Sequence, residues 1–138
     1  MTDPSDFMIL LVEDDAALAE ATYLMLDLQG YTVSVAANGK EALTQLTWQT
    51  PDLIITDWHM PKMSGIELCN MVRSSHEFGA IPIILVSGLL PRATCNPPYN
   101  TFIQKPFLAT RLLNNVERPL LQPSTPGYPL ANSDNERV

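Results

Sequence analysis

Cysteine, histidine and basic residues are all scarce in this sequence. The 138 residues include two cysteines, two histidines and eight lysines or arginines against fifteen acids, giving a net charge of −7. Cys69 and Cys95 have neither CxxC nor metal-ligand spacing, so we expect reduced thiols rather than a disulfide framework or a zinc site. The deficit of positive charge disfavours a nucleic-acid partner, because phosphate binding normally needs a basic patch.

Long apolar runs are also missing. No run approaches the roughly 20 residues that a membrane-spanning helix needs, and the N-terminus lacks the basic cluster of a secretory signal. We therefore expect no membrane partner and a cytoplasmic location. The length suits one domain with one core. Four prolines without periodicity after residue 118 predict a domain over 1–118 and a flexible Pro-rich tail over 119–138, too short to fold as an effector domain.

Apolar runs and helical patterns alternate along the first 118 residues. The pattern predicts an α/β fold with a doubly wound parallel sheet, because strands joined by helices pair in parallel. The predicted strands cover residues 8–12, 31–36, 52–57, 81–87 and 101–104. Helical patterns follow Asp15, Asn38 and Ser64, and a last one covers 107–116 and stops before Pro119. Three prolines in residues 88–100 predict mostly loop between the last two strands.

Two of these helical patterns carry recognisable apolar stripes. Leu18, Ala21, Met25 and Leu28 recur at helical spacing in the first helix. The last helix repeats the pattern with Leu108, Leu112, Leu113 and Val116. We expect both stripes to face the sheet.

Polar residues stand where the predicted strands end. Glu13 and Asp14 follow the first strand, Asp57 and Ser87 end the third and fourth, and Lys105 follows the fifth. Taken singly, each is explained as well by a helix cap or a turn. The carboxyl ends of parallel strands, however, meet at one edge of a sheet, so we expect these side chains to converge in one crevice.

The chemistry of this set predicts a metal-assisted phosphoryl acceptor. Crowded carboxylates repel unless a cation neutralises them, and hard oxygen ligands without histidine or cysteine select Mg²⁺. Asp57 can then stay ionised and act as a nucleophile that forms an aspartyl phosphate. Such transfer needs mainly alignment and neutralised charge, which Lys105 and the Ser87 hydroxyl can supply at the phosphoryl oxygens.

Four motifs carry a family resemblance: LLVEDD, TDWHMPKMSG, ILVSG and FIQKPF, in this order over about residues 7–118. The chain resembles the receiver domains of two-component response regulators, of the stand-alone, chemotaxis-regulator-like kind. The resemblance implies a flavodoxin-like sheet of order 2-1-3-4-5. It also implies roles for named residues: Asp57 as phospho-acceptor, Glu13, Asp14 and the His59 backbone carbonyl at Mg²⁺, Ser87 and Phe102 as switch residues, and Lys105 before a cis or strained proline.

The resemblance also implies partners. The donor would be a sensor histidine kinase or a histidine phosphotransfer protein, and the output would be binding of a downstream protein effector or a phosphorelay, from a monomer or weak dimer. The chain would then catalyse only its own phosphorylation and dephosphorylation. Two alternatives stay open: a Mg²⁺-dependent phosphatase with an aspartate nucleophile and His59 as proton donor, and a pseudo-receiver scaffold.

One departure from the family stands out. Receiver domains normally have a fourth helix between the last two strands, and partners often dock on the face that it makes with the fifth strand and the last helix. The proline-rich stretch 89–98 predicts that this helix is shortened or absent here. His59 also places a bulky, titratable ring beside the acceptor.

Overall fold

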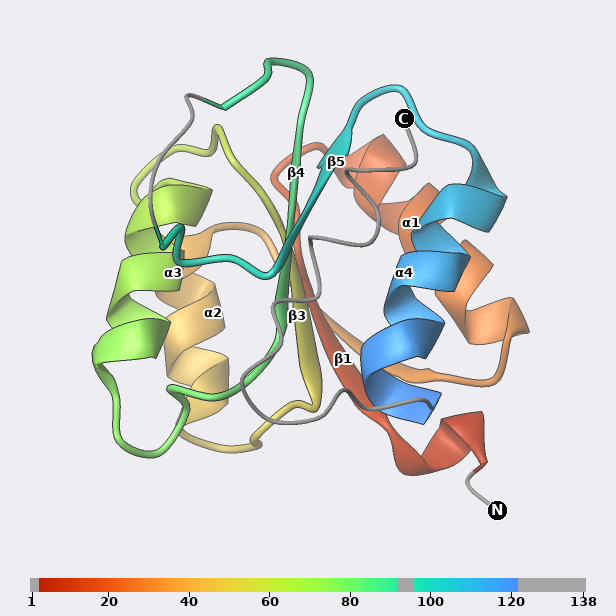
Figure 1. Ribbon diagram of the computed structural model, residues 1–138, viewed down its shortest axis with the longest axis horizontal. Helices are drawn as coiled ribbons and strands as arrows, with labels where there is room; N and C mark the ends of the chain where they lie inside the picture. Colours follow the sequence, from red (N-terminus) through yellow and green to blue (C-terminus); the bar gives the residue numbers. More distant parts are fainter. Residues whose placement is uncertain (1–2, 92–95, 122–138) are drawn as a thin grey trace.

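A single parallel sheet organises the molecule, shown in the computed structural model of Figure 1, which describes residues 3–91 and 96–121. The strand order is β2-β1-β3-β4-β5, which confirms the predicted doubly wound fold. The strands are β1 (Met8–Val12), β2 (Thr32–Ala36), β3 (Leu53–Asp57), β4 (Ile83–Ser87) and β5 (Thr101–Gln104).

Helices cover both faces of this sheet. Figure 1 shows α1 and α4 on one side and α2 and α3 on the other. Within the described residues these are the four α-helices, and a short 3-10 helix, η1, precedes β1. Their bounds are η1 (Pro4–Asp6), α1 (Ala16–Leu28), α2 (Gly39–Leu46), α3 (Gly65–Ser74) and α4 (Ala109–Leu121). None of these described helices is long and apolar enough to cross a bilayer.

The continuous apolar runs of the sequence are explained by this covering. Every residue of β3 and β4 is buried. Along β1, Ile9 and Leu11 pack on the α1/α4 side, while Leu10 and Val12 pack on the α2/α3 side. A strand with a helix layer on each face needs no polar face, so it loses the alternation of a half-buried strand.

Side-chain caps start the helices where the sequence predicted. Asp15, Asn38 and Ser64 each accept a hydrogen bond from the backbone N–H three residues on, at 3.1, 3.0 and 3.2 Å. These bonds satisfy donors that the first helical turn leaves unpaired. Gly30, with φ of +95°, follows the end of α1 in the conformation that glycine tolerates best.

The predicted inward stripe of α1 is partly wrong. Ala19, Thr22 and Leu26 are the buried residues of α1, whereas Ala21 is exposed and Leu28 is 81% exposed. The helix is apolar almost all round, so spacing alone does not select which apolar row faces the sheet. The surplus apolar row remains on the outside.

The last helix also differs from its prediction. It begins at Ala109, after the exposed Leu108, and continues through Pro119 to Leu121. Leu120 is buried in the same core cluster as Leu112 and Val116, at four-residue spacing. Proline removes only one backbone donor near the helix end, and burial of Leu120 offsets that loss. Of the expected flexible tail over residues 119–138, residues 119–121 are helical and residues 122–138 lie outside the described residues.

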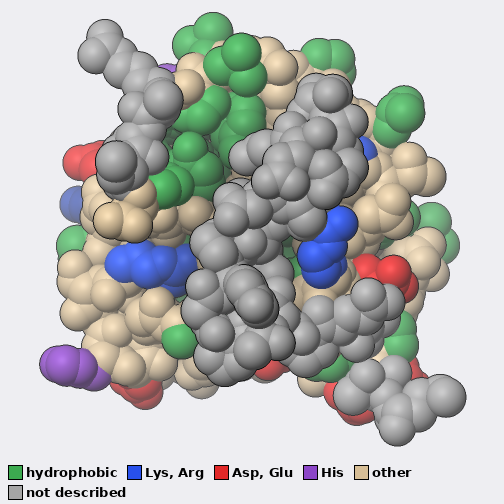
Figure 2. Space-filling model, in the orientation of Figure 1, with side chains coloured by type: hydrophobic (Ala, Val, Ile, Leu, Met, Phe, Trp, Pro, Cys, Tyr) green, Lys and Arg blue, Asp and Glu red, His purple; other side chains and the backbone are tan. Residues whose placement is uncertain are grey.

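The segment between β4 and β5 has no helix in its described parts, 88–91 and 96–100; residues 92–95, with Cys95, lie outside them. Arg73 on α3 holds the last residue of this segment, because its guanidinium donates to the Asn100 side chain at 2.6 Å. The same guanidinium donates to the carbonyls of Gly79 and Ile81 at 3.1 and 2.7 Å. In Figure 2, hydrophobic side chains gather at the top of the molecule, near the carboxyl ends of β4 and β5.

Candidate functional site

Three acids converge at the carboxyl ends of β1 and β3, which are neighbours in the sheet. Glu13, Asp14 and Asp57 each offer a carboxylate oxygen, and these oxygens all lie within 4.8 Å of one another. The register explains the convergence, because Val12 pairs with Thr56 and places both strand ends level. The sequence predicted this grouping correctly.

The main chain holds Glu13 in place. Its N–H donates to the Ala36 carbonyl of β2 at 3.0 Å, and its carboxylate accepts from the Asp15 N–H at 3.2 Å. Burial raises the pKa of Glu13, and the nearby charge of Asp57 adds to the rise, while the Asp15 and Lys105 contacts oppose it. A carboxylate with a raised pKa is one that a cation would stabilise.

Lys105 supplies the one positive charge among these side chains. Its Nζ lies 2.9 Å from Asp57 Oδ1 and 3.4 Å from Glu13 Oε1. Burial lowers the pKa of Lys105, but the hydrogen bond to Asp57 and the charges of Glu13 and Asp57 outweigh burial and raise it. The backbone N–H of Lys105 donates to the Ser87 carbonyl at 2.8 Å. The peptide bond between Lys105 and Pro106 is cis, as expected.

Asp57 is positioned by its neighbours along the chain. Its side chain is only 10% exposed. The backbone N–H of Trp58 donates to the Val86 carbonyl at 2.9 Å, and the backbone carbonyl of Trp58 accepts from the Gly65 N–H at 2.7 Å. The start of α3 is therefore held against the residue that follows Asp57. The hydroxyl of Thr56 donates to the Asp57 carbonyl at 2.9 Å. Sequence reasoning missed Thr56, although a hydroxyl inside an otherwise apolar strand was a usable signal.

The two proposed switch residues lie on neighbouring strands. Ser87 ends β4 with 1% exposure, and its Oγ accepts from the Leu89 N–H at 3.1 Å. Phe102 on β5 is half-buried, with its ring 6.4 Å from that of Tyr99. The hydroxyl thus stands at the strand edge predicted for it and is tied to the start of the β4–β5 connection.

His59 is exposed and stacks on Trp58, with ring centroids 5.5 Å apart and planes within 4°. This stacking holds the imidazole parallel to the indole of Trp58, the residue that follows Asp57 in the chain. The role of its backbone carbonyl at a metal stays a prediction.

The donor set fits Mg²⁺. It consists of carboxylate oxygens, which hard divalent cations prefer, and holds no histidine or cysteine ligand. Three acids against one lysine leave an excess of negative charge that a divalent ion would neutralise. Glu13, Asp14 and Asp57 are the residues that would hold it.

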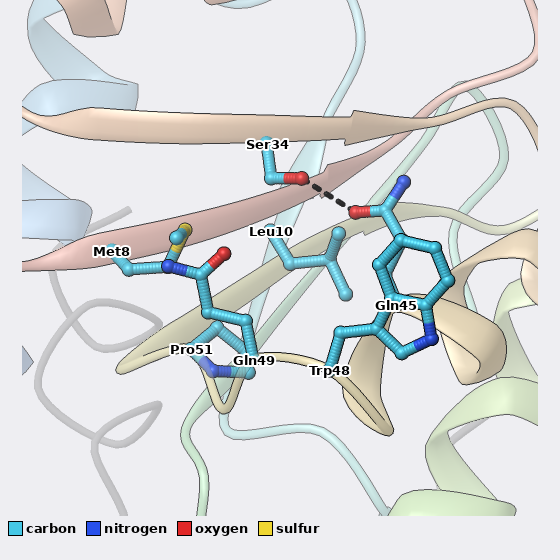
Figure 3. Close-up of a pocket in the computed structure, with 7 residues that line it drawn as sticks. All are labelled: Met8, Leu10, Ser34, Gln45, Trp48, Gln49 and Pro51. Carbon is cyan, nitrogen blue, oxygen red and sulfur yellow. Dashed lines mark hydrogen bonds between the residues drawn. The ribbon is translucent and has the colours of Figure 1, made fainter.

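A separate cavity of about 250 Å³ lies between β1, β2 and the end of α2 (Figure 3). Among the residues that line this cavity, Leu10 and Pro51 are buried and Trp48 is exposed. The Ser34 hydroxyl donates to the side-chain carbonyl of Gln45 at 2.5 Å. None of its seven lining residues carries a charge. It is therefore unsuited to phosphoryl chemistry.

Comparison with known proteins agrees with the geometry of the acidic site. The response regulator MprA of Mycolicibacterium vanbaalenii is 33% identical over 122 residues, 86% of this chain and 52% of MprA. The chain thus spans about half the length of this relative. A receiver domain of a histidine kinase from Syntrophus aciditrophicus shares 31% identity at a TM-score of 0.76, covering 88% of this chain and 96% of that one.

A second similar structure bears on the metal. The receiver domain of sensor histidine kinase PA1611 from Pseudomonas aeruginosa PAO1, described with a magnesium ion in its active-site cleft, has 27% identity and a TM-score of 0.75. The match covers 81% of this chain and 95% of that one. The family model for the response regulator receiver domain matches residues 9–117. By its fold, its acidic cluster and this match, the chain belongs to the receiver domain family of two-component signalling.

Proposed function

We propose that Asp57 accepts a phosphoryl group from a phosphohistidine on a sensor histidine kinase or a histidine phosphotransfer protein. The observation that carries this proposal is the position of the Asp57 carboxylate, bonded to Lys105 and grouped with Glu13 and Asp14. An Asp57 oxygen forms the new bond to phosphorus while the P–N bond breaks. The donor imidazole keeps the electron pair of that bond as it leaves.

The chain's own residues divide the remaining tasks. Lys105 holds Oδ1 of Asp57, which orients the carboxylate and offers a positive charge to a phosphoryl oxygen. Ser87 offers a hydroxyl at the neighbouring strand end. Glu13 and Asp14, with Asp57, would hold Mg²⁺, which supplies neutralisation of the phosphoryl charge when bound. We infer that the chain acts on no other phosphate substrate.

On this proposal, the phosphorylated chain passes on the signal by binding a downstream protein or by transferring its phosphoryl group to another protein. When Ser87 turns toward phosphoryl oxygens, it gives up the bond from Leu89, and residues 88–91 with the exposed Leu89 and Leu90 change position. The net charge of −7 favours a protein partner over nucleic acid. We place the exchange in the cytoplasm.

Acetyl phosphate tests the acceptor directly. We expect incubation with acetyl phosphate and Mg²⁺ to add the mass of one phosphoryl group to the intact protein. The adduct should be absent from Asp57→Asn and after chelation of the metal, because each change removes either the nucleophile or the neutralising ion. Asp52→Asn is the matched control, since Asp52 lies at the opposite end of β3, where it accepts from the Met8 N–H.

Other outcomes would redirect the assignment. Steady release of phosphate from small phosphate esters would identify a phosphatase instead. Absence of both an adduct and a beryllofluoride-induced spectral change would leave a scaffold without phosphoryl chemistry.

A further inference from the structure

The cavity beside Trp48 lies where α2 is too short to cover the sheet. α2 has eight residues, a length of about 12 Å at 1.5 Å per residue. The strands β1 and β2 have five residues each and are about 16 Å long. Because α2 packs on this face through Ala42 and Leu46, a corner of the sheet stays without a helix. The cavity of about 250 Å³ occupies that corner, next to the loop from α2 to β3 (Figure 3).

The apolar lining of this cavity suits an aromatic ring system. Leu10 is 2% exposed and Pro51 is buried, whereas Trp48 is 84% exposed, so most of its indole is open to contact. An apolar cavity of about 150 Å³ is large enough to bind benzene. The larger volume here therefore suits a compound of two fused rings, and the indole offers such a compound a face for stacking.

Two glutamine amides line the cavity, and one of them is fixed by the fold. Gln45 accepts from the Ser34 hydroxyl at 2.5 Å and donates to the Val35 carbonyl at 2.9 Å. Gln49 is exposed, and its amide has a donor and an acceptor to offer to a ligand. A glutamine amide forms two parallel bonds with a ring edge that carries a donor beside an acceptor. The polar edge of the ligand is therefore expected at Gln49.

The charge of the surroundings narrows the class of ligand further. None of the seven lining residues is charged, so an ion would lose solvation in the cavity without gaining a charged partner. Asp52 follows Pro51 in the chain and accepts from the Met8 N–H at 2.9 Å. Its carboxylate, within a molecule of net charge −7, also repels anions. An uncharged ligand meets neither cost.

We propose that this cavity binds a small uncharged bicyclic lactam, whose rings stack on Trp48 and whose neighbouring N–H and C=O groups pair with the Gln49 amide. The proposal goes beyond the proposed function, because the cavity begins at Met8, the first residue of β1, whereas Glu13 and Asp57 stand at the carboxyl ends of β1 and β3. Binding there needs neither Mg²⁺ nor a phosphoryl group.

The compound 2-quinolone, a lactam on two fused rings, tests the site on the full chain. We expect saturable binding in an NMR titration, with a Kd of about 1 mM or below for a compound of this size. Trp48→Ala should lower the affinity about tenfold or more, because it removes the stacking face. Its high exposure means that the core stays intact. Met71→Ala is the matched control, since Met71 is an exposed apolar side chain on α3.

A second set of titrations tests the amide edge. The compound 1-methyl-2-quinolone keeps the rings and the carbonyl but lacks the N–H, so it should bind the wild type about fivefold more weakly. Gln49→Met keeps the length of the side chain without its polar groups, and it should bind the two compounds equally. A preference for 2-quinolone that persists in Gln49→Met would contradict the pairing with Gln49.

Two further measurements separate the alternatives. Quinoline-2-carboxylate has the same ring system with a negative charge, and it should bind about tenfold more weakly than 2-quinolone or not at all. Asp57→Asn should bind 2-quinolone as the wild type does, so failure of phosphorylation and failure of this site give different results. Absence of saturable binding, an equal loss in Trp48→Ala and Met71→Ala, or tighter binding of the carboxylate would each overturn the proposal.

Discussion

At the scale of single residues, Lys105 has two roles that can be separated. Its ammonium neutralises Glu13 and Asp57 at 3.4 and 2.9 Å and is available to a phosphoryl oxygen. In Lys105→Ala we expect Mg²⁺ affinity to stay or rise, because the acids lose a competing cation. The shape change caused by beryllofluoride should weaken. Tryptophan fluorescence, to which Trp58 next to Asp57 contributes, follows both titrations, with Lys62→Ala at an exposed position as the control. A large loss of Mg²⁺ affinity in Lys105→Ala would contradict this assignment of Lys105.

Cys69 offers a pH test of the core. Burial raises the pKa of its thiol to about 12, against a smaller lowering by Arg73. Below the ordinary thiol pKa, Cys69 is protonated in both the folded and the unfolded chain, so its contribution to the free energy of unfolding is fully present. Between that pH and about 12 the Cys69 thiol ionises only in the unfolded chain, so the free energy of unfolding falls with rising pH, by about 1.4 kcal/mol per pH unit at most.

Comparison with Cys69→Ala isolates this contribution, because tyrosines and lysines titrate in the same range. Urea unfolding at pH 8 and pH 10 should show a larger loss for the wild type than for the variant. An equal loss in both proteins would mean that the thiol ionises in the fold as readily as in water.

At the scale of elements, the start of α3 sits directly against the acceptor strand. A Cβ on Gly65 would collide with the Asp57 carbonyl oxygen and meet the Trp58 Cα at 3.0 Å. Gly65→Ala should push α3 away from β3, with a loss of about 1–3 kcal/mol of stability and slower phosphorylation by acetyl phosphate. Gly88→Ala is the control, since a Cβ there meets nothing within 4 Å. Equal behaviour of the two variants would contradict this packing.

The same scale shows what the sequence could and could not predict. Caps and apolar runs predicted three helix starts and all five strands, because each depends on a few neighbouring residues. The buried face of α1 was not predicted correctly, because a helix with apolar residues on nearly every side has no single hydrophobic face. The end of α4 was missed because Pro119 was taken as a stop, although Leu112, Val116 and Leu120 continue the stripe. Tertiary burial decided both cases.

At the scale of the whole molecule, the site was predictable because topology collects it. Glu13 and Lys105 follow β1 and β5, and Asp57 ends β3, so the parallel direction of the strands brings all three to one edge of the sheet. The contacts from main-chain groups, such as Asp15 N–H to Glu13, depend on local backbone geometry that residue types do not reveal. Ala21 and Leu28 were assigned to the apolar stripe of the first helix, although both are exposed.

The extent of the domain gives the last prediction. A flexible tail that began at Pro119 would be removable without loss of stability, but Leu120 is 7% exposed and packs in the core beside Val116. A chain that ends at Arg118 should lose about 2–4 kcal/mol of unfolding free energy, as for deletion of a buried leucine. A chain that ends at Leu121 should keep nearly all of it. Leu120→Ala in the full chain should reproduce most of the loss in urea unfolding, and three equal midpoints would show that the last turn of α4 adds nothing to the core.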